Sequence, residues 1–286
     1  MVLIADSGST KTAWLGILPE GDPVKVRTEG INPYYQTEAQ IVNIVREGLL
    51  PGLTGPVERV YFYGAGCSGP EKNSVVSRAI REALDDDRVD LDINSDLLGA
   101  ARGLFHERPG IVGILGTGAN AGMYNGEGIV KQAPSMGYVL GDEGSGAVLG
   151  KHLIGRVLRN QLPQEVIKEF YATYQLTAKD ILNKIYQLPF PNRMLASFVP
   201  FIHSHIAEPD LHQLVIRNFE AFFKNYILPF TGVKSYEVNI TGSVAYYFKE
   251  QLMTTANTYH LAIGRVSKDP LAGLQNFHKQ AFVIDK

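Results

Sequence analysis

Apolar and polar positions alternate with the two-residue period of β-strands at the start of the chain. Apolar, β-branched and alternating runs predict strands at about 2–6, 11–18 and 24–29. The second run alternates well enough to be the hairpin partner of the first. The chain is therefore expected to begin with a β-hairpin, followed by a third strand.

Helical spacing of apolar residues begins after the third strand. A helix is expected over about 38–50, where Thr37 and Gln40 have the spacing of a capping box. The pattern continues with a strand near 58–64, a helix near 71–84, a strand near 89–93 and a short helix that begins at Asp96. This alternation of strands and helices is typical of an α/β protein.

The opening pattern occurs a second time near the middle of the chain. HERPG, at 106–110, interrupts the elements, and GIVGILGTGANAGMYNG then gives another strand, glycine-rich turn and strand. Helices follow near 143–160, 163–174, 177–187, 192–206 and 210–228, then a strand near 236–241, a helix, a strand near 258–264 and a final helix from about 270. We expect two domains, 1–108 and 109–286, with a helical insertion in the second. The final helix is a candidate to pack back on the first domain.

Composition excludes several classes of protein. The chain has 286 residues, 45% of them hydrophobic and 20% charged, which is ordinary for a soluble globular protein with two domains. The net charge is −2 without a stretch rich in Lys or Arg, which argues against a nucleic-acid or membrane-surface partner. Asp6 interrupts the first apolar run, so it is neither a signal peptide nor a membrane span. With Cys67 as its single cysteine the chain forms no internal disulfide, and a cytoplasmic location is expected.

The two glycine-rich turns are candidates to bind phosphate. DSGSTKT could be only a tight hairpin, with Asp6 and Ser7 bonded to the backbone and Gly8 in the left-handed conformation. Paired with GTGAN, however, it resembles one half of an anion site, because glycines let several backbone N–H groups approach phosphate oxygens. Asp6 could hold Mg²⁺ through its water shell, whereas the second turn has no acid. A P-loop is excluded, because Thr10 stands directly before Lys11 and a strand follows.

Four motifs together carry a resemblance to a known family. DSGSTKT, GTGAN, GDEGSG and ITGSVA resemble, in this order, the two phosphate motifs, the sugar-side loop and the adenosine motif of the N-acetylglucosamine kinases, grouped with the BadF/BadG-type ATPases. This family belongs to the superfamily of actin, sugar kinases and heat-shock-protein ATPases. The resemblance covers about residues 2–280. It implies two ribonuclease-H-like domains that face each other across a cleft for ATP and a sugar.

The same resemblance implies roles for the residues of these motifs. Asp6 would bind Mg²⁺, and Asp96 would accept the proton of the sugar hydroxyl as it attacks the γ-phosphate. An acid before a helix can also be only a cap, and that alternative stays open for Asp96. The predicted nucleotide contacts are Ser7, Gly8, Ser9, Thr10, Lys11, Gly116, Thr117, Gly118, Gly242 and Ser243.

The sugar side is predicted from the same carry-over. Asp142 or Glu143 would grip sugar hydroxyls, although either could instead cap the helix that follows. Asn32 and Asn120 would be further sugar contacts. The family points to N-acetylglucosamine and its 6-hydroxyl, but SMGYVLGDEG lacks the aromatic-glycine pair of the animal kinases. Glucosamine and N-acetylmuramic acid therefore stay open as substrates.

Two other functions share this fold. An ATPase that activates radical dehydratases needs cysteine ligands for an iron–sulfur cluster, and Cys67 alone is too few for the usual pattern. A sensor without catalysis would not need Asp6 and Asp96 together. The expected partners are thus ATP and a small sugar, and because the family favours dimers, a homodimer is also to be considered. Ser243 could be only a helix cap, and the histidines at 203 and 205 are read as surface or packing residues because no metal-ligand spacing surrounds them.

Overall fold

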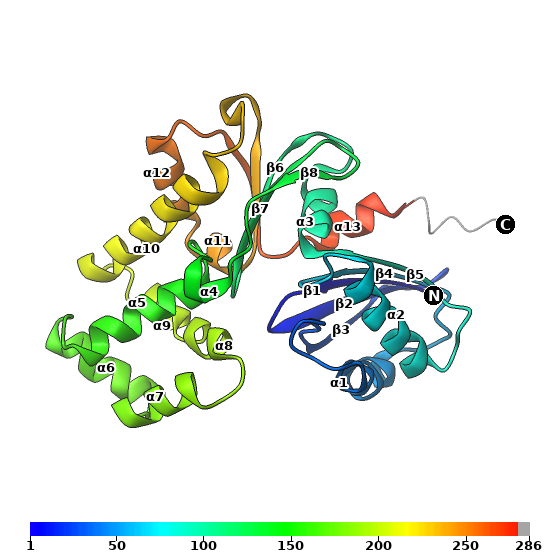
Figure 1. Ribbon diagram of the computed structural model, residues 1–286, viewed down its shortest axis with the longest axis horizontal. Coiled ribbons are helices and arrows are strands. Elements are labelled where there is room, and N and C mark those ends of the chain that lie inside the picture. Colours follow the sequence, from blue (N-terminus) through cyan, green and yellow to red (C-terminus); the bar gives the residue numbers. More distant parts are fainter. Residues whose placement is uncertain (280–286) are drawn as a thin grey trace. The chain divides into compact units, whose positions relative to one another are not determined.

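The computed structural model describes residues 1–279 and shows an α/β fold with two five-stranded sheets (Figure 1). The chain divides into two compact units. The first contains Met1–Val112, Met123–Val130 and the described residues from Asp269 onward, and the second contains Gly113–Gly122 and Lys131–Lys268. The first unit therefore includes a short middle segment and the end of the chain, in addition to the residues before 109.

The first sheet has the strand order β3-β2-β1-β4-β5. Its strands are β1 (Val2–Ser7), β2 (Lys11–Ile17), β3 (Val24–Glu29), β4 (Arg59–Gly64) and β5 (Asp90–Ser95). β2 is antiparallel to β1 and β3, whereas β4 lies parallel to β1 and β5 parallel to β4. All five strands match the segments predicted from the alternation of apolar residues, within two residues at each end.

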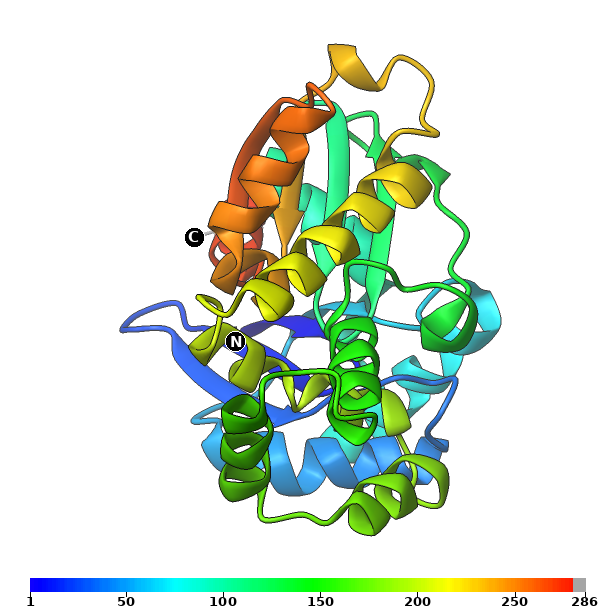
Figure 2. The ribbon, with the colours of Figure 1, turned by 90° about the vertical axis from the view of Figure 1, so that its left-hand side faces the viewer.

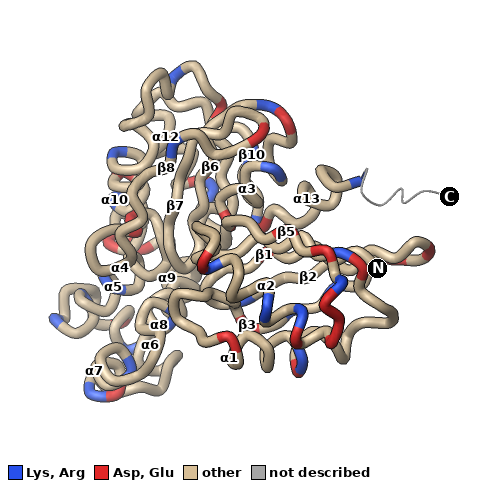
Figure 3. The backbone as a smooth tube through the Cα atoms, turned by 45° about the vertical axis from the view of Figure 1, so that its right-hand side comes forward, with Lys and Arg blue, Asp and Glu red and all other residues tan. Residues whose placement is uncertain are grey.

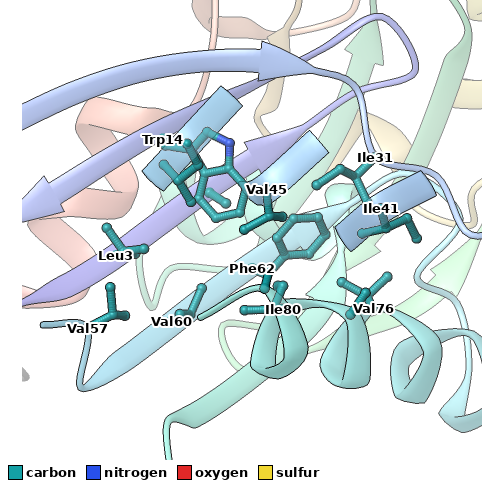
Figure 4. Close-up of a cluster of buried hydrophobic side chains, with 14 of the residues drawn as sticks. Leu3, Trp14, Ile31, Ile41, Val45, Val57, Val60, Phe62, Val76 and Ile80 are labelled. Carbon is teal, nitrogen blue, oxygen red and sulfur yellow. The ribbon is translucent and has the colours of Figure 1, made fainter. Parts of the chain in front are cut away.

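Two apolar layers cover this sheet because neighbouring residues of a strand point to opposite faces. Leu3 and Phe62 face α1 (Glu38–Asn43) and α2 (Pro70–Leu84), and Figure 4 shows Phe62 between Trp14 and the side chains of α2. The rings of Trp14 and Phe62 lie 5.8 Å apart. On the other face Ile4 and Tyr63 pack with α3 (Asp96–Phe105) and α13 (Leu271–Phe277). The ends of β1, β4 and β5 are thereby fixed between two helical layers.

The predicted helix over 38–50 is present, but only its first half is a regular α-helix. Thr37 forms the expected capping box with Gln40. The helix continues as a π-helical segment, Ile44–Leu49, and as a single 3₁₀ turn, Leu50–Gly52. Pro51 lacks a backbone N–H and ends the regular hydrogen bonding there.

The last described helix belongs to the first unit. α13 packs on α3, and a Cβ atom added to Gly273 would lie only 1.8 Å from the carbonyl oxygen of Gly103. Only a residue without a side chain permits this approach of two helix backbones. Pro270, directly before α13, lies on the same glycine of α3. α13 is therefore fixed against the helix that starts with Asp96.

The second sheet has the order β10-β9-β6-β7-β8, and the division between the units passes through β6, β7 and β8. Its strands are β6 (Gly110–Leu115), β7 (Ala119–Tyr124), β8 (Ile129–Gln132), β9 (Val238–Thr241) and β10 (Ile263–Ser267). The helices of the second unit are α4 (Gly137–Leu140), α5 (Gly146–Leu158), α6 (Gln164–Tyr174), α7 (Ala178–Tyr186), α8 (Pro191–Ala196), α9 (Val199–Ser204), α10 (Pro209–Phe222), α11 (Ser243–Tyr247) and α12 (Lys249–Thr258). Figure 2 shows α10 in yellow and α12 in orange side by side on one face of this sheet, and the two helices are in contact.

Two predicted elements of the second unit were wrong in detail. The helix expected over 192–206 is two helices, α8 and α9, because Pro200 lies in the first turn of α9 and cannot continue a helix from before it. The strand expected near 258–264 begins only at Ile263, since α12 extends to Thr258 and His260 then adopts a left-handed conformation. The strand β8 and the short helix α4 were not predicted from the sequence.

Charged residues of both signs are interleaved along the described chain in both units (Figure 3). No continuous basic stripe is visible in that view, in agreement with the net charge of −2. Within residues 1–279, no helix combines the length and the apolar character needed to cross a bilayer.

Candidate functional site

The first glycine-rich turn closes between Gly8 and Lys11, where the Gly8 N–H donates to the Lys11 carbonyl at 3.0 Å. Gly8 does not have a positive φ, so the left-handed Gly8 of the simple hairpin interpretation is wrong. It occupies the first position of the turn, which needs no positive φ. The close approach occurs instead at Gly30, where a Cβ atom would lie 2.3 Å from the Gly8 carbonyl oxygen. The loop that follows β3 is thereby packed against the turn.

Ser7 is used by the fold itself. Its fully buried hydroxyl is 2.7 Å from the Thr12 hydroxyl, donates to the Ile31 carbonyl and accepts from the Ile31 N–H. These bonds tie the end of β1 to the loop that carries Asn32. Any nucleotide contact of Ser7 is therefore left to its backbone. Thr10 and Lys11 are the exposed side chains of this turn.

Asp6 precedes the turn, and its charge is poorly compensated. Burial raises the pKa of Asp6 to about 7, the nearby carboxylates of Asp269 and Asp96 add to this shift, and Lys11 opposes it. A carboxylate in such surroundings lacks a counterion, and Mg²⁺ is commonly held by one or two carboxylates together with water and phosphate oxygens. Within residues 1–279 no cluster of three or more ligand side chains forms a closed metal cage. Asp6 thus fits Mg²⁺ in the open form that nucleotide enzymes use.

Asp96 is the first residue of α3, but it is not the cap of that helix. Ser95 is the N-cap, and its hydroxyl accepts from the Leu98 N–H. The Asp96 carboxylate accepts from the Leu97 N–H at 2.8 Å. Burial raises the pKa of Asp96 to about 6, although two backbone hydrogen bonds oppose the shift. Asp96 is thus a partly buried acid with a raised pKa, and α3 does not use it as its N-cap.

Asn32 lies beside a loop that sequence reasoning left aside. Its side-chain oxygen accepts from the Tyr34 N–H, and a Cβ atom on Gly66 would be 2.3 Å from that oxygen. Gly66 has a φ of 81° and belongs to the loop GAGCSG between β4 and α2. Cys67 of this loop is 2% exposed, and burial followed by the charge of Asp96 raises the pKa of its thiol to about 12. Cys67 is thus a buried, protonated thiol near Asp96, which is a poor ligand for a cluster.

Asp269 was also missed. It is the first residue of the segment that returns to the first unit, and its charge acts on Asp6. An acid two residues after a strand and directly before Pro270 was the available signal in the sequence. Because the strand was predicted several residues too early, Asp269 was not recognised at a strand end. In the first unit the structure thus brings the first turn, Asp96 and Asp269 together.

The second glycine-rich turn is held by backbone contacts. The Gly116 N–H donates to the Gly118 carbonyl at 3.0 Å. The first N–H groups of α5, from Gly146 and Ala147, donate to the carbonyls of Gly116 and Thr117 at 2.8 and 3.1 Å. The start of α5 and this turn therefore form one rigid piece.

The loop GDEGSG folds onto this turn through Asp142. A Cβ atom on Gly118 would lie 3.1 Å from an Asp142 carboxylate oxygen, and the Ala119 N–H donates to that carboxylate. Burial raises the pKa of Asp142 to about 6, and its φ of 59° is uncommon for a residue with a side chain. Ser145, not either acid, caps α5. Asp142 is thus held in an unusual conformation against the turn without serving as a cap.

Glu143 and Asn120 take part in local hydrogen bonds. A Glu143 carboxylate oxygen accepts from the Asn225 side chain at 2.8 Å. The Asn120 side-chain oxygen accepts from the Ala121 N–H and from Gln132. Of the two predicted acids, Asp142 is therefore the one that lies at the glycine turn.

The turn at Gly242 also packs against the second glycine turn. Gly242 has a φ of 118°, and a Cβ atom there would be 2.2 Å from the Leu115 carbonyl oxygen and 3.1 Å from the Gly116 nitrogen. Gly242 is the N-cap of α11, and Ser243, the first residue of that helix, does not make the expected cap hydrogen bond. Three motifs selected from the sequence thus meet in the second unit, at residues 116–118, 142 and 242.

Comparison with known proteins gives a consistent picture. A candidate N-acetylglucosamine kinase from Porphyromonas gingivalis shares 38% of its residues with this chain, with a TM-score of 0.92 over 98% of this chain and 99% of that one. A second candidate N-acetylglucosamine kinase, from Chromobacterium violaceum, is 17% identical, with a TM-score of 0.74 over 96% and 98% of the two chains. A ROK family glucokinase from Streptomyces griseus, in complex with glucose and AMPPNP, is 14% identical, with a TM-score of 0.62 over 98% and 99%.

The last two likenesses concern the fold alone. No family model and no curated protein matches the sequence.

Proposed function

This chain belongs to the N-acetylglucosamine kinase family, which makes it an ATP-dependent carbohydrate kinase, and we propose that it phosphorylates N-acetylglucosamine at the 6-hydroxyl. The proposal includes two ribonuclease-H-like domains of the actin-like kind that enclose ATP and the sugar. A cytoplasmic location and a homodimer belong to the same proposal.

The observation that carries the proposal is the pairing of two partly buried carboxylates with raised pKa values in the first unit. Asp6 and Asp96 come from the ends of β1 and β5, which are separated in the sheet by β4. They are close enough for the charge of Asp96 to raise the pKa of Asp6. Ser95, not Asp96, is the N-cap of α3, and Asp6 lies within β1, so helix capping gives no reason for two partly buried acids here. A phosphoryl-transfer site gives one, because it needs a base for the acceptor and a ligand for the metal.

Asp96 is assigned as the general base. An acid with a pKa of about 6 is ionised at neutral pH and still basic enough to accept a proton from a hydroxyl as that hydroxyl attacks. The Leu97 N–H holds one oxygen of this carboxylate in a fixed position at the start of α3. The proton of the 6-hydroxyl moves to Asp96 as the oxygen bonds to the γ-phosphorus, and ADP leaves with the electrons of the broken P–O bond.

Asp6 is assigned to Mg²⁺, which when bound would neutralise charge on the β- and γ-phosphates of ATP. The backbone N–H groups of the first turn, with Ser9, Thr10 and Lys11, would lie along the phosphates. In the second unit Gly116, Thr117 and Gly118 would complete the cradle, because the α5 backbone fixes this turn. Gly242 and Ser243 would lie under the adenosine. These assignments are supported by the packing of the Gly242 turn on Gly116.

The sugar is assigned to Asn32 in the first unit and to Asn120 and Asp142 in the second. Asn32 is buried beside the first turn, and its side-chain oxygen is used by Tyr34, which leaves its amide group as a donor for a sugar oxygen. The carboxylate of Asp142 can accept from sugar hydroxyls. Glu143 is assigned to the support of this loop through Asn225.

A coupled ADP-release assay across a panel of sugars tests the proposal. The panel contains N-acetylglucosamine, glucosamine, N-acetylmuramic acid and glucose, each with and without Mg²⁺. We expect the highest kcat/KM with N-acetylglucosamine and no turnover without the metal. ADP release at the same rate with and without any sugar would contradict a sugar kinase, and a preference for another amino sugar would correct the substrate.

A further inference from the structure

Next to the Gly242 turn, the second unit presents a group of side chains that the proposed transfer step does not use. Tyr246 and Tyr247 end α11, and each is 47% exposed. His203 belongs to α9, and Lys268 follows β10 directly. The sequence analysis had read His203 only as a surface or packing residue.

These side chains hold the ring of Tyr247 in a defined position. Lys268 Nζ donates to the Tyr247 hydroxyl at 2.7 Å and lies 5.0 Å from the centre of its ring. The His203 ring meets Tyr247 edge-on, with the ring centres 5.5 Å apart. Tyr246 contacts it in the same T-shaped manner at 5.4 Å. An exposed aromatic ring is thereby ordered before any ligand binds, which lowers the entropy lost on binding.

Gly242 and Lys268 lie at the carboxyl ends of two parallel strands, which is a common position for ligand sites. β9 and β10 are parallel, and Thr241 lies opposite Ser267 at their ends. The Gly242 N–H donates to the Ser267 carbonyl at 3.0 Å, so Gly242 and Lys268 leave the same edge of the sheet side by side. Ligands of open α/β sheets bind outside the carboxyl ends of parallel strands.

The distance along the chain also suits a nucleotide. Gly242 packs against Gly116 of the second phosphate turn, and α11 begins directly after it in the chain. Tyr247 lies at the end of this short helix, about 6 Å further along its axis at 1.5 Å per residue. A nucleotide with its phosphates on the turn and its ribose on Gly242 would therefore bring its base towards Tyr247.

We propose that Tyr247, held by Lys268 and His203, is the stacking surface for the base of ATP. The proposal rests on the proposed function, because the adenosine position at Gly242 comes from it. Tyr247 is a binding residue, and Lys268 is a positioning residue that acts through the Tyr247 ring. Stacking accepts every base, so Tyr247 adds affinity without selecting adenine over guanine.

Binding of ADP and of inorganic pyrophosphate, measured by calorimetry, separates the base from the phosphates. Tyr247→Ala should weaken ADP binding by roughly 5- to 100-fold, since stacking on an aromatic ring contributes about 1–3 kcal/mol per base. Pyrophosphate has no base, and its affinity should stay unchanged. Tyr247→Phe keeps the ring and should stay within a few-fold of the wild type. Tyr186→Ala, which removes an 81% exposed tyrosine from α7, is the matched control and should change neither ligand.

Unchanged ADP affinity in Tyr247→Ala would overturn the proposal. An equal loss of affinity for ADP and pyrophosphate would also overturn it, because it would indicate that Tyr247 acts through the fold or on the phosphates. Lys268→Met gives a second test that keeps the ring, with ADP binding weakened a few-fold and pyrophosphate unchanged. A Lys268→Met protein that loses pyrophosphate would contradict the positioning role. A wild-type protein that binds no ADP would also reject the proposed kinase, whereas an active wild type with an unaffected Tyr247→Ala would reject only the stacking surface.

Discussion

The two glycine-rich turns have the same strand–turn–strand pattern, yet they are held in different ways. The first turn follows Asp6 and is fixed by the Ser7 hydroxyl, through bonds to Thr12 and Ile31. The second has no acid and is fixed by backbone bonds from α5 and by the close approach of Gly242. The first turn can therefore lose charge without losing its shape, whereas the second depends on the absence of a side chain at Gly242. Substitutions in the first unit should therefore lower activity, whereas a substitution at Gly242 should lower stability.

Asp96→Asn should give the largest effect. General-base catalysis contributes about 10²- to 10⁴-fold, and kcat should fall by that order while ATP affinity changes little. Steady-state kinetics and ADP calorimetry measure the two quantities. Asp90→Asn is the control. Asp90 is the exposed first residue of β5, the strand that leads to Asp96, and its ion pair with Arg59 is exposed, so this variant should keep full activity. Turnover of Asp96→Asn within a few-fold of the wild type would place the base elsewhere.

Asp6→Asn should abolish efficient use of the metal and leave the turn intact. The amide keeps an acceptor oxygen but loses the charge that holds a hard cation, so kcat/KM should fall on the order of 10²-fold, with a higher Mg²⁺ requirement. Activity measured against Mg²⁺ concentration, beside the melting temperature, checks both parts. An active mutant with an unshifted Mg²⁺ requirement would reduce DSGST to an ordinary hairpin turn.

Gly242→Ala should show the opposite behaviour, with a loss of stability. The new Cβ would meet the Leu115 carbonyl at 2.2 Å, and alanine disfavours a φ of 118°, so the free energy of unfolding should fall by roughly 2–4 kcal/mol. Gly116→Ala is the matched control for stability, because no atom lies within 4 Å of its Cβ position. Denaturant unfolding of both proteins measures the difference. Equal stabilities would mean that the second turn tolerates a side chain at residue 242.

The smallest effect concerns pH. The pKa values of Asp6 and Asp96 are raised to about 7 and 6 in the folded protein, so folding binds protons between the ordinary aspartate range and these values. Their contribution to stability is present at low pH and is lost as the pH rises through 6 to 7. Asp6→Asn removes this loss, and its melting temperature should gain on the wild type as the pH rises from 5 to 8. A constant difference across this range would contradict the raised pKa of Asp6.

Activity should change with pH in the other direction. Asp96 must be ionised to accept a proton, so kcat/KM should rise with pH through about 6. The pH range in which the enzyme gains its base is thus also the range in which the stability contributed by these protonated acids is lost.

Local pattern was enough to predict the strands of the first sheet and the Thr37 capping box. Those elements depend on alternation and on residues three positions apart, which are visible in a single sequence. The same information could not decide which residue caps α3 or α5. Serine and aspartate stand next to each other at both places, and the structure uses Ser95 and Ser145. That choice frees Asp96 and Asp142 for the roles proposed above.

Contacts between distant segments limited the rest. Nothing local marks Asp269 as a neighbour of Asp6, because their proximity depends on the packing of α13 on α3 through Gly103 and Gly273. The burial of Cys67 beside Asp96 likewise depends on the neighbouring β4 and β5. The sequence showed the order of the motifs along the chain, and the fold shows that residues 116–118, 142 and 242 meet in the second unit.

The most direct test of the account is the structure of the product formed from ATP, Mg²⁺ and N-acetylglucosamine, determined by phosphorus-coupled NMR. We expect one new phosphate ester, with phosphorus coupled to the protons of carbon 6, and an equal amount of ADP. We also expect that Asp96→Asn gives the same product far more slowly. Free phosphate without a sugar ester, or a phosphate on another carbon, would contradict the account.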